Sequence, residues 1–162
     1  MFDLRDHPLN LYDGPLLPLV IKPYIGNYKV EQTLVDNGSA LSLLFTNTYN
    51  NLAFPRKALV PVKEPFYGIM IGMLAYPLGR IDLQVTLQEG KNLRFEILTF
   101  EVADFESSYN CILGRPCVKK FMAVAHFSYS ALKVPRPHGP LTIYSDQKGA
   151  VTYDMKTLDL IK

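Results

Sequence analysis

The sequence predicts an all-β fold, a small β-barrel or sandwich with one or two short helices. Ten glycines and twelve prolines are spread along the 162 residues, and they divide the chain into pieces that are mostly too short for ordinary helices. The clearest strand covers residues 80–87, where Ile81, Leu83, Val85 and Leu87 alternate with polar residues. Eight or nine short strands of this kind are expected, which is typical of a barrel or sandwich.

The expected elements follow in chain order between clusters of turn residues. Strands are expected at residues 19–25, 28–35, 41–45, 80–87, 93–102 and 110–113, with two late hairpin-like pieces at 123–135 and 141–153. Thr46 is expected to cap a short helical turn at 46–52. Pro116 is expected to be the first residue of a second short helix that includes 117–122. Residues 61–79 are rich in glycine, proline and aromatic residues, and they are expected to form a loop or hairpin outside the core.

Composition and charge are those of a single globular domain. A hydrophobic fraction of 48% in 162 residues is enough to bury a core. The formal charge of +2 gives no indication of nucleic acid or an anionic membrane as a partner. We expect a lead-in at residues 1–18, the domain at 19–153 and a tail at 154–162. The charged start is unlike a signal peptide and no apolar run could span a bilayer, so an intracellular, cytoplasmic location is expected.

The cysteines and histidines indicate neither a disulfide framework nor a metal site. Cys111 and Cys117 are too few to staple a domain of this size, and they are expected to be buried thiols in a reducing compartment. His7, His126 and His138 are scattered without the spacing of metal ligands. No metal and no cofactor are therefore expected.

The strongest catalytic signal is the segment Leu34-Val35-Asp36-Asn37-Gly38-Ser39-Ala40. It would place Asp36 at the end of a buried strand on a tight turn, with Gly38 allowing a strained backbone. The N–H groups of Gly38 and Ser39, and the Ser39 hydroxyl, are expected to hydrogen-bond the carboxylate. The rival interpretation is an ordinary type I′ hairpin, because Asn-Gly between two apolar runs is its strongest short signal.

Further stretches follow in the order of one protein family. The first is Phe66, Tyr67, Gly68, Ile69, Met70, Ile71 and Gly72, and the second runs from Pro77 to Leu83. The third runs from Tyr109 to Pro116 and contains Ile112, Leu113, Gly114 and Arg115. Together with residues 98–102 and 120–124, these stretches resemble the protease region of Gypsy-type retrotransposon polyproteins of plants. The resemblance covers roughly residues 19–140.

The resemblance implies a retropepsin-like closed β-barrel, the acid protease fold, which acts as a homodimer. Asp36 would be the catalytic aspartate of each copy, and Asn37, Gly38, Ser39 and Ala40 would support it. Residues 66–74 would form a flap over an extended peptide, and the Ile112–Arg115 motif would pack behind the turn. The implied function is an aspartic endopeptidase that processes a polyprotein, with a second copy and a peptide as its partners and with no nucleic acid or membrane.

The number of carboxylates favours a dimer independently of the resemblance. The chain has one Asp-x-Gly-Ser segment, and the chemistry of an aspartic protease needs two carboxylates that share a proton. A two-fold axis through the site would supply the second carboxylate without more sequence.

Asn37 departs from the family pattern, which usually has threonine at this position. Its amide is larger than a hydroxyl, and it would lie at the crowded centre of the dimer interface, where a poorly paired polar group costs ~1–3 kcal/mol. Three hypotheses therefore stay open. They are an active dimeric endopeptidase, an inactive peptide-binding or dimerisation module with the same fold, and an unrelated small β-barrel with a hairpin at 36–39.

Overall fold

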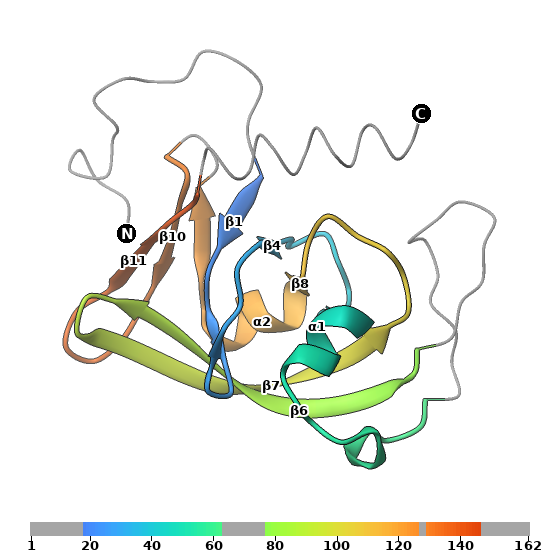
Figure 1. The fold of residues 1–162 in the computed structure, drawn as a ribbon. Coiled ribbons are helices and arrows are strands. Elements are labelled where there is room, and N and C mark those ends of the chain that lie inside the picture. Colours follow the sequence, from blue (N-terminus) through green and yellow to red (C-terminus); the bar gives the residue numbers. More distant parts are fainter. Residues whose placement is uncertain (1–17, 63–76, 127–128, 147–162) are drawn as a thin grey trace, which may run out of the picture.

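The computed structural model describes residues 18–62, 77–126 and 129–146, which fold into two β-sheets with two short α-helices (Figure 1). The larger sheet contains β1 (Leu19–Ile21), β2 (Tyr24–Ile25), β3 (Tyr28–Lys29), β4 (Thr33–Val35), β5 (Leu43–Phe45), β6 (Gly79–Glu89), β7 (Asn92–Ala103) and β8 (Cys111–Leu113). The smaller sheet contains β9 (Val124–His126), β10 (Ala131–Val134) and β11 (Leu141–Tyr144). The helices are α1 (Thr46–Asn51), the 3-10 turn η2 (Arg56–Ala58) and α2 (Arg115–Lys120).

The larger sheet has the strand order β1-β4-β8-β5-β7-β6-β2-β3, and the smaller sheet has the order β11-β10-β9. The long β6–β7 hairpin runs across the base of the larger sheet, which curls into a half-barrel (Figure 1). The predicted all-β class with two short helices is confirmed. The strands β4, β8 and β5 lie side by side at the centre, and they position the Asp36 segment.

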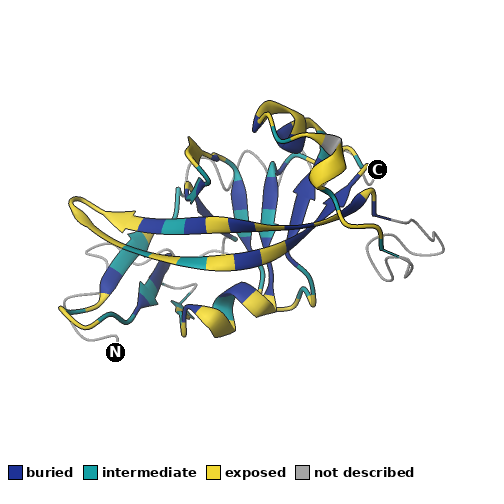
Figure 2. Cartoon of the chain, turned by 90° about the horizontal axis from the view of Figure 1, so that it is seen from below, coloured by how far each residue is buried: buried dark blue, intermediate teal, exposed yellow. Residues whose placement is uncertain are grey.

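The alternation that predicted the β6 strand corresponds to its two faces. Ile81, Leu83, Val85 and Leu87 are buried, whereas the polar residues between them lie outside. Figure 2 shows this alternation as bands of buried and exposed residues along the hairpin. Because successive side chains of a strand point to opposite faces, one face of β6 covers the core and the other faces solvent.

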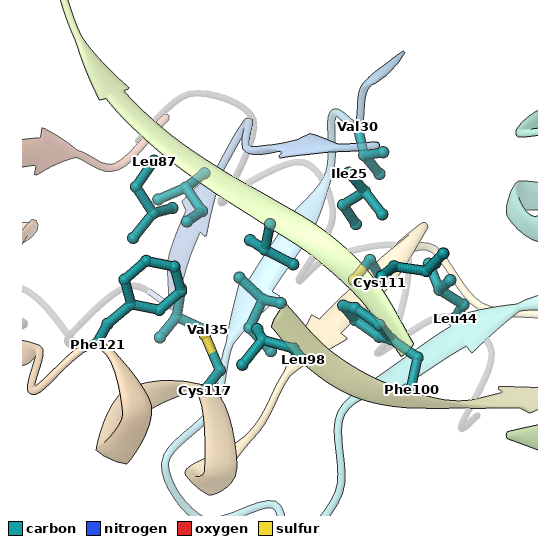
Figure 3. Packing of buried hydrophobic residues seen from close by; sticks show 14 of the residues in the cluster. Ile25, Val30, Val35, Leu44, Leu87, Leu98, Phe100, Cys111, Cys117 and Phe121 are labelled. Carbon is teal, nitrogen blue, oxygen red and sulfur yellow. The ribbon is translucent and has the colours of Figure 1, made fainter. Parts of the chain in front are cut away.

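The main core fills the concave side of the half-barrel. Leu87 from β6 and Phe121 after α2 lie toward one end of this core, and Leu44 and Cys111 lie toward the other, around Phe100 of β7 (Figure 3). Burying one large apolar side chain contributes about 1.5–3 kcal/mol relative to leaving it exposed. A smaller cluster packs on the opposite face of the central strands, and it includes Val20, Leu43, Phe45, Ala103 and Tyr109.

Two expected strands are each divided in the structure. The strand expected at 19–25 is interrupted at Pro23, which has no N–H for a ladder hydrogen bond. The strand expected at 28–35 breaks around Gln32, whose φ of 55° lies in the left-handed region. The chain thereby changes direction between β3 and β4, and β4 pairs with β1 and β8 instead.

The expected helix caps differ from those in the structure. Phe45, not Thr46, is the N-cap of α1, and its side chain makes no capping hydrogen bond. The Thr46 hydroxyl instead donates to the carbonyl of Ala103 at 3.1 Å and ties the helix to β7. Helix α2 begins at Arg115, one residue before the expected first residue Pro116, so Pro116 occupies its second position.

The late segments form one small sheet. The hairpin expected at 123–135 is present as β9 and β10. The strand at the start of the expected 141–153 hairpin is β11, and it pairs with β10. Residues 147–153 of that expected hairpin lie outside the described residues.

Candidate active site

The Asp36 segment forms a tight turn directly after β4. The Ser39 N–H donates to the main-chain carbonyl of Asp36 at 3.1 Å, which closes a four-residue turn. Neither Asn37 nor Gly38 has a positive φ, whereas a type I′ turn requires one at both central residues. The ordinary type I′ hairpin and the strained Gly38 backbone are therefore both wrong.

The strands on either side of this turn do not pair with each other. Strand β8 lies between them, parallel to β4 and antiparallel to β5. The Asp36 N–H donates to the carbonyl of Leu113 at the end of β8, at 2.9 Å. The turn therefore bridges two strands that a third strand separates, which no two-residue hairpin does.

One of the three expected donors reaches the Asp36 carboxylate. The Gly38 N–H donates to Asp36 Oδ1 at 2.9 Å. The Ser39 hydroxyl instead donates to the carbonyl of Leu41 at 2.7 Å, while the Ser39 N–H bonds the Asp36 main chain. Asp36 is partly exposed, and Asn37, Gly38 and Ala40 are exposed, so the carboxylate faces solvent at the surface of the single chain.

The motif after β8 holds the turn from behind. The Arg115 N–H donates to the carbonyl of Ser39 at 2.7 Å, and the Gly114 N–H donates to the hydroxyl of Ser42 at 3.1 Å. Gly114 is buried, and a Cβ atom there would collide with the carbonyl of Leu41 and lie 2.9 Å from the carbonyl oxygen of Ser39. Only glycine allows this close approach of two backbone segments.

Ser42 was not among the expected site residues. It is 2% exposed, and its hydroxyl accepts the Gly114 N–H that would otherwise be buried without a partner. The available signal was a single hydroxyl residue inside the apolar run Leu41-Ser42-Leu43-Leu44.

The Arg115 side chain contacts the exposed side of the same turn. Its Nε donates to the carbonyl of Asn37 at 3.2 Å, and its Nη2 lies 3.4 Å from the carbonyl oxygen of Gly38. The guanidinium group thus binds the two carbonyls at the centre of the turn. The sequence motif placed Arg115 behind the turn but did not indicate these contacts.

The expected flap, Phe66 to Gly72, lies outside the described residues. The described chain resumes at Pro77, and the Leu78 N–H donates to the carbonyl of Val102 at 2.8 Å. A surface depression of about 630 Å³ lies between β1 and β11. It does not include Asp36, so we assign it no role in catalysis.

The two cysteines are buried within the main core. Burial raises the pKa of Cys111 well above its ordinary value, and burial raises that of Cys117 from 9.0 to about 12. Neither thiol is therefore a ready nucleophile. Among the described residues, no group of three or more His, Cys, Asp or Glu side chains is arranged to hold a metal ion. In the same part of the chain, no helix has the length and apolar character needed to cross a bilayer.

Comparison with known proteins finds similarity in structure alone. No protein-family model matches the sequence, and no curated protein matches it. The retroviral protease-like domain of Ddi1 from Leishmania major superposes with a TM-score of 0.56 at 16% identity, over 79% of this chain and 92% of that one. A retropepsin-like aspartic protease from Rickettsia conorii gives a TM-score of 0.51 at 16% identity, over 77% and 81% of the two chains.

A third solved structure, the EIAV protease in complex with the inhibitor HBY-793, gives a TM-score of 0.43 at 23% identity, over 71% of this chain and 97% of that one. The first two similarities each cover more than three quarters of this chain. The chain therefore has a retropepsin-like aspartic protease fold.

Proposed function

We propose that this protein is an aspartic endopeptidase of the retropepsin type, active as a homodimer with one Asp36 from each copy. The observation that carries this proposal is the Asp36 turn itself. The Gly38 N–H holds the Asp36 carboxylate, and Asp36 is partly exposed. Behind the turn lies Gly114, whose lack of a Cβ atom allows the two backbone segments to approach closely. The fold alone would not assign an activity, because one fold hosts many functions.

A second copy would complete the site. Among the described residues, no other carboxylate lies on this turn, and Asp36 and the exposed Asn37 and Gly38 are on the surface of the single chain. Two such turns that meet across a two-fold axis would bring two Asp36 carboxylates together. Two carboxylates held close together do not both ionise easily, so the pair would share one proton.

The chemistry follows from that shared proton. The ionised Asp36 would take a proton from a water molecule, which then attacks the scissile carbonyl carbon. The protonated Asp36 of the other copy would donate to the carbonyl oxygen. The Gly38 N–H would keep each carboxylate in one orientation throughout, which reduces the reorganisation needed at the moment of reaction.

The finer parts of the proposal concern the substrate and the origin of the chain. We assign residues 66–74 as a flap over an extended peptide, which would bind as an added strand. The substrate class would be a polyprotein, and the chain would be the protease region of a plant Gypsy-type retrotransposon. The support for the flap, the polyprotein substrate and the retrotransposon origin is the sequence resemblance.

The test is cleavage of an unfolded protein substrate between about pH 4 and pH 7, the interval above the ordinary carboxyl pKa values. Four proteins are compared, namely the chain itself, Asp36→Ala, Asn37→Thr and the control Asp82→Ala. Asp82 is an exposed carboxylate on the outer face of β6, bonded to the hydroxyl of Thr99 at 2.6 Å.

We expect the chain and Asp82→Ala to cleave, and Asp36→Ala to be inactive. Inhibition by a statine-type peptide should accompany the cleavage. Cleavage that survives Asp36→Ala would refute the proposal, and so would a chain that dimerises without cleaving even as Asn37→Thr. Sedimentation across a concentration series would establish whether a dimer forms.

A second candidate function is an inactive peptide-binding or dimerisation module with the same fold. The observation that favours it is Asn37, whose exposed side chain at the apex of the turn would be buried in the proposed dimer. If its amide found no partners there, the dimer would lose ~1–3 kcal/mol, or about one to two powers of ten in affinity. Cleavage by Asn37→Thr but not by the chain itself would support this module.

A further inference from the structure

Two charged side chains, those of Asp36 and Arg115, meet at one peptide bond of the turn, the bond between Asn37 and Gly38. The N–H of this bond donates to Asp36 Oδ1 at 2.9 Å. The carbonyl oxygen of the same bond accepts from Arg115 Nε at 3.2 Å. The amide is thus held between a carboxylate at its hydrogen and a guanidinium group at its oxygen.

This arrangement makes the Gly38 nitrogen a better nucleophile. A cation at the carbonyl oxygen stabilises the negative charge that the amide acquires when it loses its proton. A carboxylate at the hydrogen is placed to accept that proton, within the distance that general base catalysis needs. The two groups come from distant parts of the sequence, since Arg115 is 78 residues from Asn37 along the chain.

The electrophile lies in the preceding side chain. Asn37 is exposed, and its side-chain amide makes no hydrogen bond within the described part of the chain. Gly38 is exposed and has no Cβ atom to hinder its nitrogen. The other described asparagines precede larger residues, as Asn27 precedes Tyr28 and Asn92 precedes Leu93.

We propose that Asn37 is a self-modification site, at which the folded turn promotes deamidation to aspartate and isoaspartate. Asp36 takes the proton from the Gly38 nitrogen, and that nitrogen forms a bond to Asn37 Cγ. The bond from Cγ to the side-chain nitrogen then breaks, and ammonia leaves with the proton. One water molecule opens the resulting succinimide ring at either carbonyl, so the net reaction consumes water and releases ammonia without any change of oxidation state.

The product carries a new carboxylate next to Asp36. If the chain acts as the proposed dimer, two added negative charges would face each other near the two-fold axis, and like charges there would oppose association. The reaction would therefore limit the lifetime of the dimerisation-competent form. This consequence rests on the proposed function, whereas the modification itself does not.

The experiment follows Asn37 by peptide mapping and mass spectrometry, which resolves aspartate and isoaspartate from asparagine. The full chain is incubated at a dilution at which sedimentation finds a monomer, in buffer and in denaturing urea. We expect Asn37 to convert about tenfold faster in the folded chain than in urea, because Asp36 and Arg115 meet the peptide bond only in the folded state. A folded rate equal to or below the rate in urea would overturn the proposal.

Variants separate the two groups from general effects of folding. Arg115→Gln should slow the folded reaction about tenfold, the size expected for one charge-assisted hydrogen bond. Asp36→Asn should slow it as well, and Gly38→Ala should nearly abolish it. Arg136→Gln, which removes a similar hydrogen-bonded arginine between β10 and β11, should leave the rate unchanged.

Circular dichroism and the urea rate of each variant show whether it still folds. If Arg115→Gln unfolds, the conservative Arg115→Lys replaces it and should slow the reaction because it has no guanidinium group. An unchanged rate in both folded Arg115 variants would also overturn the proposal. A chain that deamidates at Asn37 but never cleaves a peptide would support this proposal and refute the proposed protease activity. A chain that cleaves peptides but does not deamidate at Asn37 would support the protease activity and refute this proposal.

Discussion

Replacing Gly114 with alanine should destabilise the protein through a direct collision between backbone segments. Gly114 has φ of −87°, which alanine adopts without strain. A Cβ atom there would nevertheless overlap the carbonyl of Leu41 and lie 2.9 Å from the carbonyl oxygen of Ser39. Because these neighbours are backbone atoms rather than the end of a flexible side chain, β8 or the Asp36 turn would have to move.

The magnitude follows from the hydrogen bonds that such a movement would break. Three join β8 and its exit to the turn region: Asp36 N–H to Leu113, Arg115 N–H to Ser39, and Gly114 N–H to the hydroxyl of Ser42. At about 1 kcal/mol each, their loss lowers the free energy of unfolding by about 3 kcal/mol. In a chain of this size that loss corresponds to a fall in Tm of about 6–12 °C.

Urea unfolding followed by far-UV circular dichroism measures this change, with Gly90→Ala as the control. Gly90 has φ of 60° at the tip of the β6–β7 hairpin, and an added Cβ atom there would meet no atom within 4 Å. Gly90→Ala should therefore cost only the ~1–2 kcal/mol of a left-handed backbone. A loss below about 1 kcal/mol for Gly114→Ala would refute the close approach described here.

Three further changes test other parts of the fold. Arg94→Met should lower the free energy of unfolding by about 2–4 kcal/mol in urea titrations. The reason is that the Arg94 guanidinium donates to the carbonyls of Phe121 and Pro135 and lies 5.3 Å from the centre of the Phe121 ring. A loss below about 1 kcal/mol would contradict this prediction. The free energy of unfolding should fall as pH rises from about 9 toward 12, because Cys117 has a pKa of about 12 in the folded state and ionises more readily when unfolded. Cys117→Ala should make this fall less steep. An equal dependence of stability on pH in the variant would contradict the prediction. Tyr49→Phe should lower the free energy of unfolding by about 1 kcal/mol, because it removes the hydrogen bond from the Tyr49 hydroxyl to the carbonyl of Pro55. An unchanged Tm in a thermal melt would count against this hydrogen bond.

Local patterns in the sequence predicted the parts of the fold that depend on neighbouring residues. The buried face of β6 follows from strict alternation of apolar residues before the Gly90 turn, so the sequence predicted which of its side chains are buried. The inner face of β7 was harder to predict from the sequence, because the charged residues Arg94 and Glu96 lie on the same face as the buried residues of this strand. They are tolerated there because they pair with each other at 3.0 Å, and Arg94 also binds backbone carbonyls.

Contacts between segments far apart in the sequence could not be predicted in this way. The sequence placed Asp36 after a strand and Gly114 after another, but it gave no rule by which β8 inserts between β4 and β5. The hydroxyl of Ser42 and the N–H of Gly114 are 72 residues apart in sequence, and only the folded sheet brings them together. The Arg115 contacts with Asn37 and Gly38 are missed for the same reason.

The inserted strand also explains why the Asn37-Gly38 pair does not make the hairpin that it favours locally. A type I′ turn joins two strands that pair with each other, whereas β4 and β5 are separated by the width of β8. The turn must span that width, and the backbone of β8 and of Arg115 supplies the hydrogen bonds that a paired strand would have supplied. The peptide groups of the turn are thereby left at the surface next to the Asp36 carboxylate. A tertiary contact has thus overridden a strong local preference at the point where the sequence indicated catalysis, which is where such conflicts are expected in a functional fold.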